Sequence, residues 1–350
     1  MNILAIDTSC DETSVAVTTG RRVLANVIYS QILIHKKWGG VVPSLAKRAH
    51  EERIDLVINE TLKKLLGPVS ISPSSMKSVD AIAVTYGPGL AVALEVGIKK
   101  AKELAKKYNK KILAINHMEG HIYSAFVQNS KGNPKCDFDF PYLVLLVSGG
   151  HTELVLFEDH LKYKVIGQTI DDAAGEALDK AAKMLGLGYP GGPIIERLAQ
   201  EANNKDYFKF PRPMLRSQDL NFSFSGLKTA FYYFVKKMPD SDKNKQLKEL
   251  VSSFQEAVFD TLVKKTEKAI KLTGTNRLIV SGGVSANFYL RKKFRQLVEG
   301  NEGTVLFPSY KYLTGDNAAM IGVAAYYHAI KDDFIKDPNT LDRVPRLILT

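Results

Sequence analysis

Two histidines, His117 and His121, lie four residues apart in the motif HMEGH, inside an apolar stretch of the chain. Residues at i and i+4 share one face of a helix, and two imidazoles on one face are suited to bind a metal ion. A zinc peptidase of the HExxH type carries its catalytic glutamate directly after the first histidine, where this chain has Met118. Glu119 lies about 200° around the helix from His117, so it points away from the shared face. The spacing favours a metal site over a peptidase, and a packed pair of histidines is the alternative.

A third metal ligand has to come from elsewhere in the chain, because two histidines rarely complete a site. The candidate is Asp316, in the segment LTGDNAAMIG before an apolar helix. An aspartate there could equally cap the helix by accepting backbone amides. Together with His117 and His121 it would give a two-histidine, one-carboxylate set. Such a set suits iron(II) or zinc and leaves positions open for a substrate oxygen.

A second group of polar residues lies in the later half of the chain. Asp172, Glu176 and Asp179 are expected at i, i+4 and i+7 of one helix, where like charges repel unless something neutralises them. A ribose or another polar ligand could do so, and so could nearby lysines in a surface network. The loop GYPGGP at 188–193 has little side-chain bulk, so it either approaches a base or sugar closely or is only a turn.

The chain is basic, with 48 lysines and arginines against 37 acidic residues and a net charge of +11. This balance favours an anionic partner, nucleic acid first, held by phosphate attraction without sequence readout; a generic basic surface is the alternative. From Lys205 to Lys237, basic residues alternate with aromatic ones, a mixture able to meet phosphates and stack on unpaired bases. We interpret the phenylalanines there as core residues and some of the cations as functional.

The chain pattern indicates an internal duplication. A length of 350 residues favours two lobes. A strand, turn and strand at residues 3–18 recur at 142–157, and each pair is followed later by a strand, a glycine turn and a helix. The expected parts are a first lobe at 1–135, a second lobe at 136–316, and a C-terminal helix and tail at 317–350 that could pack back on the first lobe.

The sequence offers no sign of export or membrane insertion. The N-terminus, MNILAIDTS, has no charged leader region, and no segment offers about 18 uninterrupted apolar residues. The two cysteines, Cys10 and Cys136, are too few for a disulfide framework, which fits a reducing compartment. We therefore expect a cytoplasmic protein.

Several motifs follow one another in a fixed order: DTSCDET (7–13), GGVVPSLAKRAH (39–50), GPGL (87–90), HMEGH (117–121), LVSGGHTEL (146–154), DDAAGEALDK (171–180), YPGGP (189–193), FSFSGLKT (222–229) and SGGVSAN (281–287). With them, most of the chain resembles the TsaD (Gcp) family of tRNA N6-adenosine threonylcarbamoyltransferases, within the actin-like ATPase superfamily. Leu146 and His151, on either side of VSGG, resemble the bacterial type.

The resemblance implies an α/β fold of duplicated actin-like lobes (ASKHA, ribonuclease H-like) with a cleft between them. It also implies an acyltransferase that moves the threonylcarbamoyl group of threonylcarbamoyl-AMP to the exocyclic amine of an adenosine in tRNA. That adenosine is the one 3′ of the anticodon in tRNAs reading codons that begin with A. A metal in the cleft would assist the transfer.

The resemblance further assigns residues. The metal ligands would be His117, His121 and Asp316, with one divalent ion per chain, Fe(2+) favoured and Zn(2+) or Mg(2+) as alternatives. The adenylate site would be lined by Leu146, Val147, Ser148, Gly149, Gly150, Asp179, Gly192 and Asn287. Asp11 and Glu12 would lie near the reacting centre, and our hypothesis makes Asp11 the base that a poorly nucleophilic amine needs.

The implied partners are tRNA, the adenylate supplied by TsaC, and the proteins TsaB and TsaE. The chain departs from the family pattern at Gly315, an apparent extra glycine in front of Asp316, which leaves the path of that loop open. The alternative function is an actin-like ATP-binding scaffold or an ATPase without transfer activity. A metallopeptidase is much less favoured because the HExxH glutamate is missing.

Overall fold

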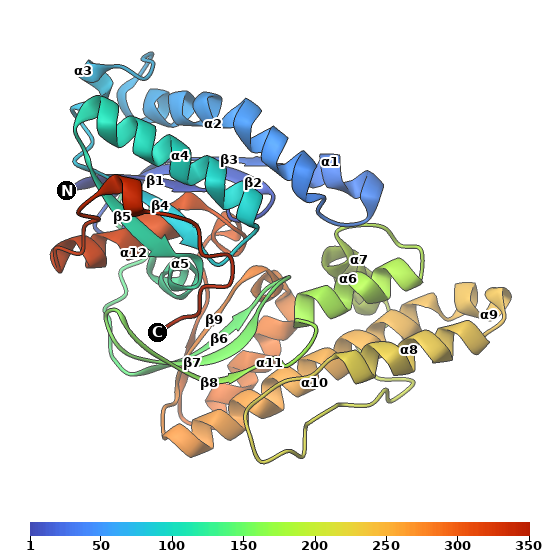
Figure 1. Ribbon diagram of the computed structural model, residues 1–350. Coiled ribbons are helices and arrows are strands. Elements are labelled where there is room, and N and C mark those ends of the chain that lie inside the picture. The colour runs from blue at the N-terminus through green and yellow to red at the C-terminus, as the bar shows by residue number, and fades with distance from the viewer. The chain divides into compact units, whose positions relative to one another are not determined.

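The computed structural model describes all 350 residues, and the chain falls into two compact units. Unit 1 comprises residues 1–138, 160–162 and 308–350, and unit 2 comprises residues 139–159 and 163–307 (Figure 1). The lobe boundaries expected near residues 135 and 316 stay a prediction.

Unit 1 is built on a five-stranded mixed sheet in the order β3-β2-β1-β4-β5. The strands are β1 (Asn2–Asp7), β2 (Glu12–Thr19), β3 (Arg22–Ser30), β4 (Ala81–Gly87) and β5 (Lys111–Asn116). β1, β2 and β3 pair antiparallel, whereas β1, β4 and β5 pair parallel. The central strands are apolar runs buried along nearly their whole length, as expected for a sheet covered on both faces.

Helices cover both faces of this sheet. The longer helices are α2 (Pro43–Leu66), α4 (Ala91–Tyr108) and α12 (Ala318–Ile330); the shorter ones are α1 (Ile32–His35), α3 (Pro73–Met76) and α5 (His117–Tyr123), with 3₁₀ turns η1 (Lys36–Trp38), η2 (Ser124–Phe126), η4 (Lys311–Leu313) and η5 (Pro338–Thr340). α2 and α4 pack together over side chains such as Leu4 and Ile6, which alternate with Ile3 and Ala5 along β1. α12 contacts β1, β2 and β5, and it also contacts α5.

Unit 2 repeats the design of the unit 1 sheet. Its strands are β6 (Tyr142–Val147), β7 (Thr152–Asp159), β8 (Lys162–Gln168), β9 (Arg277–Ser281) and β10 (Thr304–Leu306), in the order β10-β9-β6-β7-β8. β6 pairs antiparallel with β7 and parallel with β9, as β1 does with β2 and β4. The internal duplication predicted from the sequence is therefore confirmed.

The core of unit 2 lies between this sheet and its helices. They are α6 (Ala174–Met184), α7 (Gly191–Glu201), α8 (Ser225–Lys237), α9 (Asp240–Lys245), α10 (Leu247–Thr273) and α11 (Phe288–Glu299), with the 3₁₀ turn η3 (Gly283–Ala286). The interpretation of the phenylalanines as core residues is confirmed for Phe210, Phe222 and Phe224, which are all buried. None of the helices in the two units has the length and apolar character that a membrane crossing requires.

Candidate functional site

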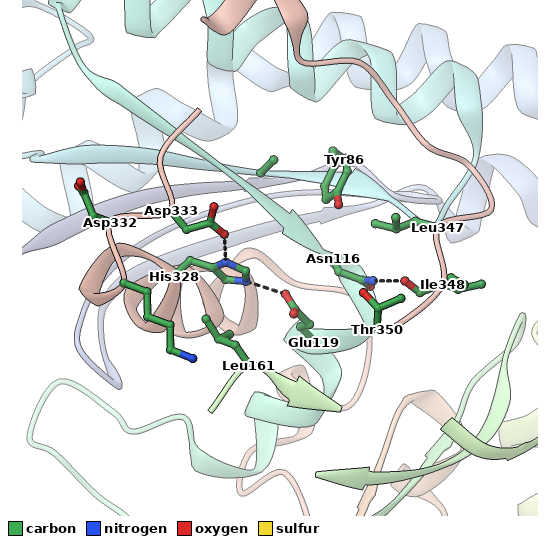
Figure 2. Close-up of a pocket in the computed structure, with 12 residues that line it drawn as sticks. Tyr86, Asn116, Glu119, Leu161, His328, Asp332, Asp333, Leu347, Ile348 and Thr350 are labelled. Carbon is green, nitrogen blue, oxygen red and sulfur yellow. Dashed lines mark hydrogen bonds and ion pairs between the residues drawn. The ribbon is translucent and has the colours of Figure 1, made fainter. Parts of the chain in front are cut away.

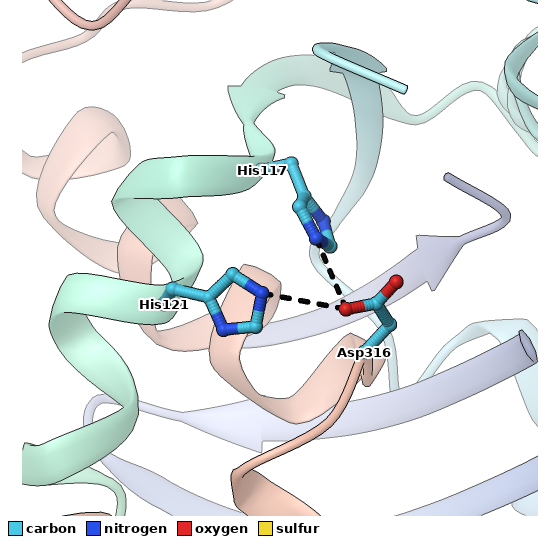
Figure 3. Close-up of side chains that lie close together, drawn as sticks. All are labelled: His117, His121 and Asp316. Atoms are coloured by element: carbon cyan, nitrogen blue, oxygen red, sulfur yellow. Dashed lines mark hydrogen bonds and ion pairs between the residues drawn. The ribbon is translucent and has the colours of Figure 1, made fainter. Parts of the chain in front are cut away.

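The helix that carries the two histidines starts directly at the end of a strand. β5 ends at Asn116, whose side-chain oxygen accepts a hydrogen bond from the Met118 amide at 2.9 Å and so caps α5. All seven residues of α5 are buried. His117 and His121 project from one side of the helix, as the i, i+4 spacing predicts, and their ring centroids are 4.7 Å apart (Figure 3).

Asp316 reaches the two histidines from a segment 199 residues away from His117. Its Oδ1 lies 3.2 Å from Nε2 of His117 and 3.3 Å from Nε2 of His121 (Figure 3). The alternative interpretation of Asp316 as a helix cap is wrong, because Asn317 caps α12 by accepting the Met320 amide at 3.0 Å. The loop before it is closed by Asn317, whose side-chain amide donates to the Gly315 carbonyl at 2.9 Å.

The three side chains form a charged group in which the two histidines are buried and Asp316 is partly buried. Burial would lower the pKa of His117, but the carboxylates of Asp316 and Asp7 outweigh it and raise the pKa to about 10. Burial would likewise raise the pKa of Asp316, yet the two histidines hold it well below the usual range. Asp7 itself is fully buried, with Oδ2 at 3.6 Å from Nδ1 of His117.

The donor set fits a metal ion. Two imidazole nitrogens and one carboxylate oxygen, which lie within 4.8 Å of one another, converge on one point, and each residue can supply one ligand atom. Mixed nitrogen and oxygen ligands suit iron(II) and zinc better than the all-oxygen sites of calcium or magnesium. The group could therefore hold a metal ion.

The turn between β1 and β2 brings two further carboxylates under the influence of Asp316. Burial and then the charge of Asp316 raise the pKa of Asp11, and burial, Asp11 and Asp316 raise the pKa of Glu12 well above its usual value. After burial, the charge of Asp316 thus contributes to the raised pKa of both carboxylates of the predicted catalytic pair.

A histidine that we did not predict, His50, contacts both the turn between β1 and β2 and the start of β2. His50, on α2, is fully buried; its Nδ1 lies 2.7 Å from the Thr13 hydroxyl and its Nε2 lies 3.0 Å from the Cys10 carbonyl. Because a carbonyl can only accept, Nε2 carries the proton and Nδ1 accepts from Thr13. His50 is the last residue of the motif GGVVPSLAKRAH, but the residue types of this motif do not indicate that it contacts Cys10, 40 residues earlier.

The predicted adenylate residues are partly brought together in unit 2. Gly149, Asp179, Gly192 and Asn287 line one cavity of about 220 Å³, between the turn after β6, helix α6, the start of α7 and the turn before α11. Leu146 and Val147 do not line it, being buried in β6, and neither do Ser148 and Gly150. The Ser148 hydroxyl instead accepts the amides of Gly150 and His151, which shapes the turn.

Two of the cavity residues also hold its walls. Oδ1 of Asp179 accepts the amides of Gly191 at 2.7 Å and Gly192 at 3.2 Å, so α6 fixes the start of α7. Asn287 caps α11 by accepting the Leu290 amide, and its amide group donates to Gln255. Glu196, which we did not predict, lines the same cavity.

The expected row of three carboxylates on one helix is wrong for Asp172. α6 begins at Ala174, so Asp172 lies before the helix. Lys180 bridges Asp172 and Glu176, with both distances 2.8 Å, and Lys228 also pairs with Asp172. Lysines thus neutralise these two acids as a plain ionic network, leaving Asp179 at the cavity.

A second cavity, of about 550 Å³, lies in unit 1 behind the histidine helix. Figure 2 shows His328 between two carboxylates at its wall: Nε2 lies 2.9 Å from Glu119 and Nδ1 lies 2.8 Å from Asp333. Glu119 therefore points away from the face of His117 and His121, as predicted from its helical position, and binds α12 instead.

Comparison with solved structures places the chain in a fold class. The structure of HypF from T. kodakarensis matches with a TM-score of 0.61 at 14% identity, over 95% of this chain and 48% of that chain. The activator of the 2-hydroxyisocaproyl-CoA dehydratase from Clostridium difficile, with bound ADPNP, matches with a TM-score of 0.52 at 12% identity, over 95% and 97%. Two mixed sheets in two units, with these neighbours, define an actin-like ATPase fold, as predicted.

Sequence comparison is more specific. The model of the TsaD family, tRNA N6-adenosine threonylcarbamoyltransferase, matches residues 22–323. Proteins of that name from Thermosipho africanus and Endomicrobium trichonymphae are 46% and 49% identical, over 99% and 93% of this chain and 99% and 92% of theirs. The one from Clostridium kluyveri is 45% identical over 100% of this chain and 98% of its own. The chain belongs to the tRNA N6-adenosine threonylcarbamoyltransferase family, a family of acyltransferases, and the predicted resemblance is confirmed.

Proposed function

We propose that this protein transfers the threonylcarbamoyl group of threonylcarbamoyl-AMP to the exocyclic amine of the adenosine 3′ of the anticodon, in tRNAs that read codons beginning with A. The observation that carries the proposal is the convergence of His117, His121 and Asp316 in a chain 46% identical to a family member over 99% of its length. In the reaction, the amine nitrogen forms a bond to the carbamoyl carbon, the bond from that carbon to the phosphate oxygen breaks, and AMP leaves.

His117, His121 and Asp316 would hold one divalent metal, with Fe(2+) favoured over Zn(2+) and Mg(2+). The ion, when bound, supplies a positive charge that polarises an oxygen of the adenylate and stabilises the charge on departing AMP. The burial of His117 and His121 and the partial burial of Asp316 support this assignment, because a low-dielectric surrounding strengthens their hold on a cation.

Asp11 would take the proton of the attacking amine. A base works best when its pKa lies near the working pH, and burial together with the charge of Asp316 moves the pKa of Asp11 upward, in that direction. Glu12, whose pKa is raised further, would stay protonated to a higher pH than Asp11 and would serve as the neighbouring hydrogen-bond donor.

The adenylate would bind in the unit 2 cavity. Gly149, in the turn after β6, and Gly192, in the first turn of α7, leave its walls without side-chain bulk, so that a nucleotide can approach the backbone. We extend this site to all of Leu146, Val147, Ser148, Gly149, Gly150, Asp179, Gly192 and Asn287, since the residues outside the cavity wall form the strand and turn that carry it.

TsaC would supply the adenylate, TsaB and TsaE would complete the assembly, and the cytoplasm would be its location.

The test is nucleoside mass spectrometry of an unmodified tRNA reading A-starting codons, after incubation with the protein, TsaB, TsaE and chemically supplied threonylcarbamoyl-AMP. We expect threonylcarbamoyladenosine with the wild-type protein and none with His117→Ala or Asp316→Ala. The matched control is Asp332→Ala, which removes an exposed carboxylate of the same unit outside the proposed ligand set. Asp316→Ala with unchanged metal content and transfer would overturn the ligand assignment.

The alternative is an actin-like nucleotide-binding scaffold or ATPase without transfer activity. The actin-like fold alone would permit it, because that fold carries many functions. A folded, metal-loaded protein that yields no modified adenosine with partners from its own source, yet hydrolyses ATP, would favour this alternative.

A further inference from the structure

Helix α8 shows a clear division between a buried and an exposed face. Leu227, Phe231 and Val235 lie one turn apart and are buried, with Phe231 packed on Phe254 of α10 at 4.7 Å between ring centroids. The next aromatic residue, Phe234, rests against Phe208 and Phe210 of the preceding loop. These contacts cover the inner side of α8, and the side chains on its outer side are exposed.

The outer side carries two parallel rows with the same composition. Tyr232 is followed one turn later by Lys236, and Tyr233 by Lys237, so each row presents an aromatic ring and then a cation. Tyr232 and Tyr233 are 43% and 55% exposed, and their ring centroids are 5.4 Å apart. Nζ of Lys236 lies 5.7 Å from the centre of the Tyr232 ring.

The two lysines differ from others nearby. Lys228, on the same helix, pairs with Asp172, and Lys243, on α9, pairs with Asp240. Neither Lys236 nor Lys237 has an ion-pair partner. The outer face of α8 therefore combines exposed aromatic surface with uncompensated positive charge.

This combination discriminates between kinds of partner. A protein interface is depleted in lysine at its centre, since burying an ammonium ion without a partner is costly. Single-stranded nucleic acid has the opposite demand, because its bases stack on aromatic rings while its phosphates draw cations. The net charge of +11 over the chain favours the same polyanion.

We propose that the outer face of α8, formed by Tyr232, Tyr233, Lys236 and Lys237, binds unpaired nucleotides of RNA by stacking and phosphate contact. The inference rests on the proposed function in one respect: it takes the RNA to be the substrate tRNA. It assigns the tyrosines a binding role and the lysines a role in the salt dependence of binding.

The experiment measures binding of unmodified tRNA by fluorescence anisotropy over a series of salt concentrations, with the full-length protein. Tyr232→Leu/Tyr233→Leu keeps a helix-forming apolar side chain but removes the flat rings, so we expect the dissociation constant to rise about tenfold or more with an unchanged salt slope. Lys236→Gln/Lys237→Gln should lower the slope of log K against log salt by about 1.4, since about 0.7 is lost for each phosphate contact.

The matched control is Lys106→Gln/Lys107→Gln, which removes two consecutive lysines from the last turn of α4 in unit 1. It changes the net charge by the same amount and should leave both the dissociation constant and the salt slope near wild type. Equal losses in the α4 and α8 variants would mean that total charge matters and not this face, which would overturn the proposal.

The readouts separate this inference from the proposed function. If the wild-type protein modifies tRNA and the α8 variants bind and modify it equally well, the α8 proposal is wrong and the function stands. If the wild-type protein binds no tRNA, the proposed function is wrong, and the α8 proposal that rests on it is wrong as well. If the α8 variants keep tRNA binding but lose a protein partner in size-exclusion chromatography, the face binds protein, and the RNA assignment is overturned.

Discussion

The carboxylate of Glu119 and Nε2 of His328 lie 2.9 Å apart and tie the histidine helix to the far end of α12. Asp316 lies just before Asn317, the cap of α12, so α5 and the segment that leads into α12 hold the three proposed metal ligands. Gly120 lets α5 and α12 approach closely, because a Cβ there would meet Ile321 Cδ1 at 2.7 Å. The contact between Glu119 and His328 therefore helps to fix the distance between the two histidines and Asp316. It acts on the side of α5 that faces away from the histidines.

We expect Glu119→Ala to lower metal affinity about tenfold or more, the usual effect of losing a residue that orients metal ligands. Competition between the protein and a chelator of known affinity measures this without reference to transfer activity. Asp333→Asn is the control: Asp333 contacts the other nitrogen of His328 but is largely exposed, so its loss should cost much less. Wild-type affinity in a folded Glu119→Ala protein would contradict the positioning role.

His328 also gives a pH dependence whose sign can be stated. Burial would lower its pKa, but Glu119 and then Asp333 outweigh burial and raise it. A group whose pKa is raised by folding stabilises the folded state fully below its unfolded value of about 6.5, and that stabilisation is lost as pH rises through the folded value. Urea unfolding at pH 6 and pH 8 should show a larger loss of stability in the wild-type protein than in His328→Gln. Parallel losses in the two proteins would refute this contribution.

The metal group was predictable in part because its signal is local. Spacing alone puts His117 and His121 on one helical face, and a helix keeps that relation whatever the tertiary fold. Asp316 had two interpretations of equal weight, since a carboxylate before a helix is also a typical cap. The adjacent Asn317 takes the cap, which only the backbone conformation decides.

Other residues were beyond sequence reasoning. His50 acts through a backbone carbonyl, and backbone groups are the same at every position of the sequence. Asp172 was expected within a helix that begins only at Ala174, because Asp171 and Asp172 fit the charge pattern of a first helical turn. In the structure Asp171 accepts the amides of Phe224 and Ser225 at the start of α8 instead.

The adjacent glycines Gly282 and Gly283 give a matched pair for stability. Gly282 has φ of +92°, and a Cβ there would meet the Val147 carbonyl oxygen at 2.5 Å, whereas a Cβ at Gly283 meets nothing within 4 Å. The obstacle at Gly282 is backbone, which cannot turn aside. We expect Gly282→Ala to lower the free energy of unfolding by about 3 kcal/mol and Gly283→Ala by under about 1 kcal/mol. Thermal unfolding of both variants checks this, and equal costs would contradict the close packing of the turn on β6.

His50 provides a test of how the Asp11 turn is held. Loss of its ring leaves the Thr13 hydroxyl and the Cys10 carbonyl without their buried partner, so His50→Ala should cost about 1–3 kcal/mol of stability. The larger effect should be on the reaction, because Cys10 immediately precedes the proposed base. At saturating tRNA, kcat should fall at least about tenfold with little change in KM, as expected when a catalytic group is displaced and substrate binding is not.

Two further variants decide whether His50 acts by position or only by filling space. His50→Gln can still donate to the Cys10 carbonyl and should recover much of kcat, whereas His50→Leu fills the space without a donor and should not. Burial lowers the pKa of His50 below its unfolded value of about 6.5. The neutral ring therefore contributes fully to the free energy of unfolding above about pH 6.5, and this contribution is lost as pH falls through the lower pKa of the folded state. Equal kcat values for the Gln and Leu variants would show that the hydrogen bond to Cys10 does not position Asp11.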